Sequence, residues 1–362
     1  TVRVRISQTD RLRRNMNQQE AIIQLNKWDT NELLFKDYLQ VTSGTLSLDA
    51  FCQKWENEPF SMKYAMSPET MDDYLQEDNF IPDRYDITIL KSPRYAPLFW
   101  HRHDFYEIVY VLSGKCTIIF RNTVLELSCG DFLMIAPNYS HQISVPGDDC
   151  IVLDILIRSS TLLDIFFNAI RDKTLISRFL LSHTYGGKMF SYLLFHTRND
   201  SAIRNYILDI YIELARTDEY SNRIATSLIT ILFTQLVRHY SATADMPDMH
   251  RSDNVYGARI MGYLLDHYAD CTLESLSRHL HFSHQYCSKI IKSATGLSFP
   301  ELLTGIRLQK AENLLLATPM KINDISEHLG YGNPETFIRV FKKHFGITPS
   351  AYRKSRRPGP SS

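Results

Sequence analysis

The chain has 362 residues, of which 44% are hydrophobic, and equal numbers of acidic and basic side chains. That length permits two or three domains with well-packed cores. No apolar run reaches the roughly 18 residues of a membrane-spanning helix, and no signal peptide is recognisable. The six cysteines form no CxxC pair, which is typical of buried thiols in a reducing compartment. We therefore expect a cytoplasmic protein without a membrane segment.

The first two stretches of the chain differ in hydrophobic periodicity. Residues 1–85 carry apolar side chains at three- and four-residue steps, which predicts a helical N-terminal extension. Residues 86–158 are rich in β-branched and aromatic residues and are interrupted by turn residues such as Ser113-Gly114. Short strands at this spacing predict a β-barrel. The clearest strands are expected at 87–90, 108–112, 116–120 and 151–156.

The predicted barrel contains a group of side chains suited to binding a ligand. His101, His103 and Glu107 are close in sequence, and the two histidines lie on the same face of a strand. His141 follows further along the chain. Imidazoles with one carboxylate suit a mid-series transition metal. The same side chains, with Tyr110, could instead line an effector pocket or be ordinary core residues.

This stretch resembles the cupin barrel, although Ala136 and Asn138 replace a proline and a glycine that are common in its second motif. The metal-binding positions of that fold match four residues: His101, His103, Glu107 and His141. The resemblance implies a cupin-like effector-binding barrel, for which we expect no cofactor. The alternative is a barrel that holds a divalent transition metal, in a metal-dependent cupin enzyme fused to a DNA-binding domain.

Residues 159–241 return to helical periodicity and are expected to form a coupling and dimerisation region. One apolar stripe is a candidate dimer seam, although packing within the chain would use it equally well: Ile203, Ile207, Ile210 and Leu214. A second stripe contains Ile224, Leu228, Ile231 and Gln235. Residues 242–254 are polar with one proline and are predicted to be a linker.

Residues 255–357 contain the same helical pattern twice, at 273–296 and 322–346. The offset is 49 residues through the first helix and 50 afterwards, so the second copy has one extra residue in its turn. Each copy combines a short amphipathic helix, a tight turn and a second amphipathic helix. This is a helix-turn-helix, whose second helix can lie in the major groove of DNA. A continuous helix predicted at 299–316 would hold the two copies at a fixed separation.

Polar residues on the outward faces of the second helices are candidate DNA contacts, because such side chains reach base edges and phosphates. In the first copy they are Ser283, His284, Gln285, Ser288, Lys289 and Lys292. In the second copy they are Asn333, Glu335, Thr336, Arg339, Lys342 and Lys343.

Several motifs of this region are highly specific, above all the run from Phe341 to Pro349, with Gly330-Tyr331 and Arg307-Leu308 before it. With them, residues 255–354 resemble the AraC/XylS family of bacterial transcription regulators. The resemblance implies two helix-turn-helix units that enter successive major-groove faces of one site. It also implies that the cupin-like domain senses a small molecule. Departures at Cys287 and Thr336 concern the base contacts rather than the fold.

Charge is distributed unevenly along the chain, in agreement with this interpretation. Residues 255–357 hold 14 Lys and Arg against 8 Asp and Glu, as expected for a nucleic-acid-binding module. We therefore expect an α+β multidomain protein, with a cupin-like barrel and flanking helices followed by an all-α domain of two helix-turn-helix motifs. Its function would be sequence-specific transcription regulation, not catalysis. The expected partners are double-stranded DNA, a small-molecule effector such as a sugar, a second copy in a homodimer, and RNA polymerase.

Overall fold

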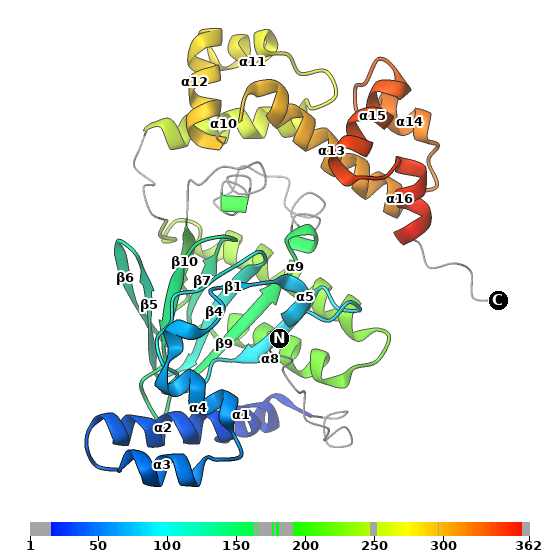
Figure 1. Ribbon diagram of the computed structural model, residues 1–362. Helices are drawn as coiled ribbons and strands as arrows, with labels where there is room; N and C mark the ends of the chain where they lie inside the picture. The colour runs from blue at the N-terminus through cyan, green and yellow to red at the C-terminus, as the bar shows by residue number, and fades with distance from the viewer. Residues whose placement is uncertain are drawn as a thin grey trace, which may run out of the picture. The chain divides into compact units, whose positions relative to one another are not determined.

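The computed structural model describes residues 16–162, 165, 176, 179–180, 191–246, 252–295 and 297–356 (Figure 1). The chain forms two compact units. The first unit comprises Thr1–Ile176 and Ser191–Pro247, and the second unit comprises Ser177–Phe190 and Asp248–Ser362. No helix in the described ranges is long and apolar enough to span a membrane. All six cysteines are free thiols.

The first unit opens with four helices where the periodicity predicted helical structure: α1 (Gln18–Asn26), α2 (Thr30–Thr42), α3 (Leu48–Lys54) and α4 (Pro59–Met66). Reciprocal capping boxes begin α1 and α2, with Asn17 and Asp29 as the capping residues. Three short elements that the sequence did not indicate follow: a 3-10 turn (Pro68–Thr70), strand β1 (Tyr74–Leu75) and helix α5 (Glu77–Phe80).

A buried ion pair holds these N-terminal helices on the barrel. The Arg94 guanidinium donates from Nε and Nη2 to the two carboxylate oxygens of Glu32, each at 2.9 Å. Lys91 Nζ donates to the same carboxylate at 2.7 Å. Arg94 and Glu32 are 2% and 0% exposed, and the guanidinium lies 3.8 Å from the ring centroid of Trp28. The N-terminal extension is therefore an integral part of the first unit.

The barrel is built from two antiparallel sheets. The larger has the order β10-β7-β4-β9-β2, with bounds Tyr192–His196, Asp131–Ile135, Tyr106–Ser113, Ile151–Ile157 and Ile87–Lys91. The smaller has the order β6-β5-β8, with bounds Thr123–Ser128, Lys115–Phe120 and His141–Ser144. A short strand β3 (Arg102–His103) pairs in parallel with β1. All four predicted strands are present, as β2, β4, β5 and β9.

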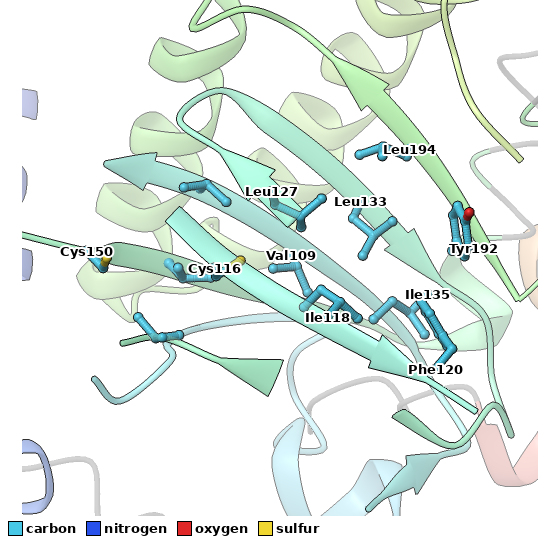
Figure 2. Packing of buried hydrophobic residues seen from close by; sticks show 13 residues of the cluster. Val109, Cys116, Ile118, Phe120, Leu127, Leu133, Ile135, Cys150, Tyr192 and Leu194 are labelled. Carbon is cyan, nitrogen blue, oxygen red and sulfur yellow. The ribbon is translucent and has the colours of Figure 1, made fainter. Parts of the chain in front are cut away.

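Apolar side chains from both sheets share one core, which Figure 2 shows from close by. Val109 of β4, Leu133 of β7 and Ile118 of β5 are completely buried in it. Successive side chains of a strand point to opposite faces, so Glu107, two residues before Val109, also points to the interior. Phe132 points the opposite way and packs against Phe233, with ring centroids 6.3 Å apart.

Two helices, α8 (Ser201–Arg216) and α9 (Ser221–Tyr240), pack against each other and contact the larger sheet. The apolar stripe on α8 packs within the protomer, which is the second of the two alternatives predicted for it and not the dimer seam. Ile203, Ile207 and Ile210 are at most 1% exposed, and Leu214 packs on a cluster that includes Phe105. The second predicted stripe, on α9, remains partly open.

Residues 159–241 also contain a strand that the helical prediction missed. β10 lies at the edge of the larger sheet, paired with β7. The predicted linker 242–254 differs as well. Asp245 and Leu194 of β10 exchange two backbone hydrogen bonds of 2.8 Å, and helix α10 already begins at Ser252. The segment is therefore partly bound to the barrel and partly helical, and its residues 247–251 lie outside the described ranges.

The second unit contains helices α10 (Ser252–Asp266), α11 (Leu273–Leu280), α12 (His284–Thr295), α13 (Phe299–Ala317), α14 (Ile322–His328), α15 (Pro334–Phe345) and α16 (Pro349–Arg356). The two predicted helix pairs are α11 with α12 and α14 with α15, and α13 is the predicted bridging helix. Gly296, the predicted closing residue of the first copy, lies outside the described residues.

Candidate functional site

The second helix-turn-helix is fixed by aromatic packing on one face of α15. Phe337 and Phe341 are 0% exposed and pack with Ile325 and Leu329. The helix begins with Asn333, whose side chain accepts a hydrogen bond of 2.8 Å from the backbone N–H of Glu335. It ends at Gly346, whose φ of 78° is left-handed. Buried aromatics and two caps thus set the direction in which the opposite face points.

The opposite face of α15 carries five of the six predicted contact residues in exposed positions, and the sixth, Thr336, is half-buried. The exposed residues are Asn333, Glu335, Arg339, Lys342 and Lys343. Asn333 has a second role, because its amide oxygen caps the helix and only its NH₂ group is left for a base.

The first helix-turn-helix has the same design. Cys287, Ile290 and Ile291 of α12 are at most 2% exposed, so the thiol of Cys287 replaces a larger apolar side chain without leaving the core. Ser283 caps α12, since its Oγ accepts from the N–H of Tyr286 at 3.1 Å. Of the predicted contacts on this helix, Ser288 is half-buried. The others are exposed: His284, Gln285, Lys289 and Lys292.

Inside the barrel, the four predicted ligand residues come together in a buried cluster, the histidine cluster (His101, His103, Glu107 and His141). Glu107 Oε2 lies 3.1 Å from His103 Nε2 and 2.9 Å from His141 Nε2. Ligand atoms of His101, Glu107 and His141 all lie within 4.8 Å of one another, which suits a metal ion. His103 is outside that group of three and contacts Glu107 instead.

The hydrogen-bond acceptors that surround His103 and His141 show where these rings need a proton or a cation. The Nδ1 atoms of His103 and His141 face the carbonyl oxygens of Phe105 and Tyr139, at 2.7 and 3.1 Å. A carbonyl oxygen only accepts, so each Nδ1 carries a proton. Each Nε2 faces a second acceptor, the Glu107 carboxylate. Each of these short contacts therefore needs a proton between Nε2 and the Glu107 oxygen, or a cation bound at Nε2.

The charge states of the neighbouring groups follow from burial and contact. Burial, followed by the nearby His141, lowers the pKa of His101 to about 3, so this ring is neutral at neutral pH. Burial acts to raise the pKa of Glu107, but the hydrogen bonds from His103 and His141 outweigh it. The pKa of Glu107 consequently lies well below its usual value, and Glu107 is a carboxylate.

Asp154 is a polar residue of the barrel interior that the sequence interpretation missed. It pairs with Val109 across β9 and β4 and therefore points inward. Ser92 donates a hydrogen bond to its Oδ2, whereas its Oδ1 is buried with no partner among the described residues. Burial and the charge of Glu107 raise its pKa well above the usual value. One signal was present in the sequence: Asp154 is the single charged residue in an apolar run of strand residues.

Tyr110 does not belong to the pocket, contrary to the prediction. It lies three residues after Glu107 on β4 and so points to the other face of the sheet. Its side chain is completely buried there. The charged groups that act on its hydroxyl include Arg204 and Asp200 of the α8 region.

The N-terminal helices reach the histidine cluster through three aromatic rings. Phe99 stacks on His101 with centroids 4.6 Å apart, and Tyr64 of α4 meets Phe99 edge to face at 5.3 Å. Phe35 of α2 contacts Tyr64 at 5.4 Å. The extension, which matched no motif in the sequence, therefore covers this part of the barrel.

The two units together define a class of protein: a DNA-binding regulator with paired helix-turn-helix units and a separate ligand-binding barrel. A family model described as a helix-turn-helix domain matches residues 276–355, and another described as an AraC-like ligand binding domain matches residues 92–233. The chain belongs to the AraC family of transcription regulators. The predicted family and fold class are confirmed.

Relatives agree with this assignment. The chain is 26% identical over 287 residues to the transcriptional activator RhaR of Pectobacterium carotovorum, covering 77% of this chain and 94% of RhaR. It is 37% identical over 119 residues to the uncharacterized regulator YtdP of Bacillus subtilis, covering 32% of this chain but only 15% of YtdP. It is 33% identical over 130 residues to the raffinose operon regulatory protein RafR of Pediococcus pentosaceus, covering 36% and 46%.

Among solved structures, the C-terminal domain of AraT, a response regulator from Geobacillus stearothermophilus, is 39% identical. The match covers 29% of this chain and 89% of that domain, with a TM-score of 0.28. The DNA-binding domain of AdpA, solved with a target DNA, is 22% identical, covers 28% and 92%, and has a TM-score of 0.27.

Proposed function

We propose that this regulator binds duplex DNA through α12 and α15 and responds to a small polar molecule, such as a sugar, bound in the barrel. The observation that carries the DNA assignment is that both helices bury an apolar face and expose polar and basic side chains. The twelve predicted contact residues are the proposed DNA-binding set, with Arg339, Lys342 and Lys343 reaching phosphates or guanine edges.

The effector pocket is proposed at the histidine cluster and Asp154. These polar groups are enclosed by an apolar barrel, where the unpaired Asp154 Oδ1 favours a ligand that forms a hydrogen bond with it. Sugar hydroxyls both donate and accept hydrogen bonds, and one relative is named for a raffinose operon. An effector that binds only one arrangement of the barrel would shift the population of that arrangement and so change DNA binding.

We further propose a homodimer formed through α9. Ile224 and Ile231 are 41% and 43% exposed, and Leu228 between them is half-buried, so one face of this helix is apolar. Pairing two copies along this face would join two DNA-reading units and raise the affinity for repeated sites. As a transcription regulator, the protein would act in the bacterial cytoplasm and contact RNA polymerase at its promoters.

A metal-binding barrel is the second candidate, favoured by one observation. The Nδ1 atoms in the histidine cluster face carbonyl oxygens, the arrangement that leaves Nε2 free to bind a metal. His101, Glu107 and His141 would hold the ion, which would supply Lewis acidity. We favour a hydrogen-bonded cluster without metal, in a regulator without catalytic activity, because Glu107 already has two imidazole partners.

The DNA assignment is tested by alanine substitution of one exposed basic residue on each recognition helix. Arg339→Ala and Lys289→Ala should each weaken binding to a duplex selected from a random pool by roughly tenfold. If the lost contact is to phosphate, the slope of log affinity against log salt concentration should also become shallower by about one. Lys54→Ala, in the first unit, is the matched control. Unchanged affinity of both variants across several salt concentrations would contradict the assignment.

Elemental analysis separates the two barrel hypotheses. Full-length protein purified without chelators should contain no stoichiometric transition metal if His103 and His141 are held by protons. About one equivalent of Zn, Fe, Mn or Ni, lost in a His141→Ala variant, would instead establish the metal-binding alternative.

A further inference from the structure

One side chain on the bridging helix contacts both helix-turn-helix units. Arg307 of α13 donates from Nε to the carbonyl oxygen of Tyr268 at 2.9 Å and from Nη2 to that of Ala269 at 3.0 Å. Both carbonyls belong to the loop that leads from α10 into the first helix-turn-helix. The same guanidinium lies 5.3 Å from the ring centroid of Tyr331, in the turn of the second one.

The loop and the turn also touch each other directly. Gly330 has a left-handed φ of 77°, and a Cβ atom at this position would lie 1.7 Å from the carbonyl oxygen of Ala269. The hydroxyl of Tyr268 lies 3.2 Å from Nε2 of His328. Only glycine permits this approach of two backbones. The contact joins segments about 60 residues apart and lies on neither recognition helix.

A bridging helix alone would not fix the orientation of the two reading helices. At 1.5 Å per residue, the 19 residues of α13 set a length of about 28 Å. Apolar packing of α13, such as that of Leu308 and Leu315 on Phe337, restricts rotation of the units but is non-directional and does not exclude it. The contact of the loop with the turn opposes this rotation, and the two charge-assisted bonds of Arg307 hold the loop in place.

We propose that Arg307 and Gly330 are positioning residues that make α12 and α15 one rigid reader, which accepts two half-sites at a single spacing. The inference rests on DNA binding by both helices. A rigid reader loses little freedom on binding, so it gains affinity at the matched spacing. It cannot follow the second half-site when that site moves along and around the duplex.

The test compares full-length wild type, Arg307→Ala and Gly330→Ala on three duplexes. The first is selected from a random pool by the wild type. The second carries one extra base pair between the half-sites, which moves the second half-site by about 3.4 Å and rotates it by roughly 35°. The third has one half-site scrambled, and circular dichroism verifies that each variant keeps its helices.

The wild type should lose about tenfold in affinity on the duplex with the extra base pair. Both variants should lose no more than about twofold on that insertion, while their affinity for the scrambled duplex stays at the wild-type value. Arg339→Ala is the matched control, because losing a contact lowers affinity but cannot make the inserted duplex bind more tightly than the scrambled one, as a flexible reader would.

Two results would overturn the proposal. One is that the variants keep the wild-type penalty for the inserted base pair. The other is that they lose affinity for the scrambled duplex as well, which would assign the two residues to folding. Absence of wild-type binding to any selected duplex would instead refute DNA binding itself.

Discussion

At the scale of single residues, sequence spacing identified the histidine cluster but not its neighbours. The histidines and Glu107 were found because metal-ligating residue types close in sequence are conspicuous. The error at Tyr110 was avoidable, since a residue three positions along a strand points to the opposite face. The pair of Glu32 and Arg94 was not predictable, because its members are 62 residues apart and each one, taken alone, is predicted to be exposed.

The Glu32–Arg94 pair gives a stability prediction. Arg94→Ala should lower the free energy of unfolding by about 3–5 kcal/mol, because it leaves the Glu32 carboxylate buried with less compensation. Denaturant titration of the first unit measures this change. Lys54→Ala removes the exposed partner of an ion pair with Asp37 and should cost less than about 1 kcal/mol. Equal losses of unfolding free energy in the two variants would show that burial does not determine how much an ion pair stabilises the fold.

The stability that Arg94→Ala loses should depend on pH, because Glu32 is titratable. Burial acts to raise the pKa of Glu32, but the bonds from Arg94 and Lys91 outweigh it, so the folded-state pKa lies below the ordinary 4.5. The stabilisation is therefore complete above about pH 4.5 and disappears as pH falls through the lower folded-state value. The difference between wild type and Arg94→Ala should shrink in acid and remain constant near neutrality.

At the scale of elements, periodicity predicted the helices well and missed strands β1 and β10. β10, Tyr192–His196, begins with four apolar residues, and such a short run fits a buried strand or part of a buried helix equally well. Only its partner β7 decides between them. The stripe on α8 shows the same limit, since periodicity finds an apolar face without revealing whether the protomer or a second copy covers it. Packing of α8 leaves α9 as the candidate dimer helix.

The exposed face of α9 gives a prediction about assembly. Ile224→Glu combined with Ile231→Glu should turn a dimer into a monomer, because it places charges in the apolar contact. Sedimentation velocity at several protein concentrations measures the change. The control is Ile23→Glu on α1, because Ile23 is also an exposed isoleucine, at 57%, but is not part of α9. A wild type that remains monomeric throughout would remove the proposed dimer.

At the scale of the whole molecule, the DNA-reading unit was predictable almost completely, whereas the role of residues 1–85 was not. The helix-turn-helix copies depend on local patterns within about 25 residues. The extension gains its role only through contacts with the barrel, such as the stacking of Tyr64, Phe99 and His101. Contacts of that kind leave no periodic trace in a sequence.

The division into two compact units predicts separate responses to DNA. All three tryptophans, Trp28, Trp55 and Trp100, lie in the first unit, so tryptophan emission reports on that unit alone. Both units contribute helix to far-UV circular dichroism, so selected duplex should raise the midpoint of only part of that signal and leave the tryptophan transition unchanged. A common shift of both signals would show that the units unfold together.

The docking of the extension on the barrel has a practical consequence for choosing fragments. A fragment that starts at residue 92, where the ligand-binding family match begins, would lack β2. It would also lack Glu32, the carboxylate that pairs with Arg94. It would also uncover the aromatic rings beside His101. Ligand screening on such a shortened piece would sample a damaged form of the proposed effector pocket, so a fragment for crystallisation or calorimetry should start before the cap of α1 at Asn17.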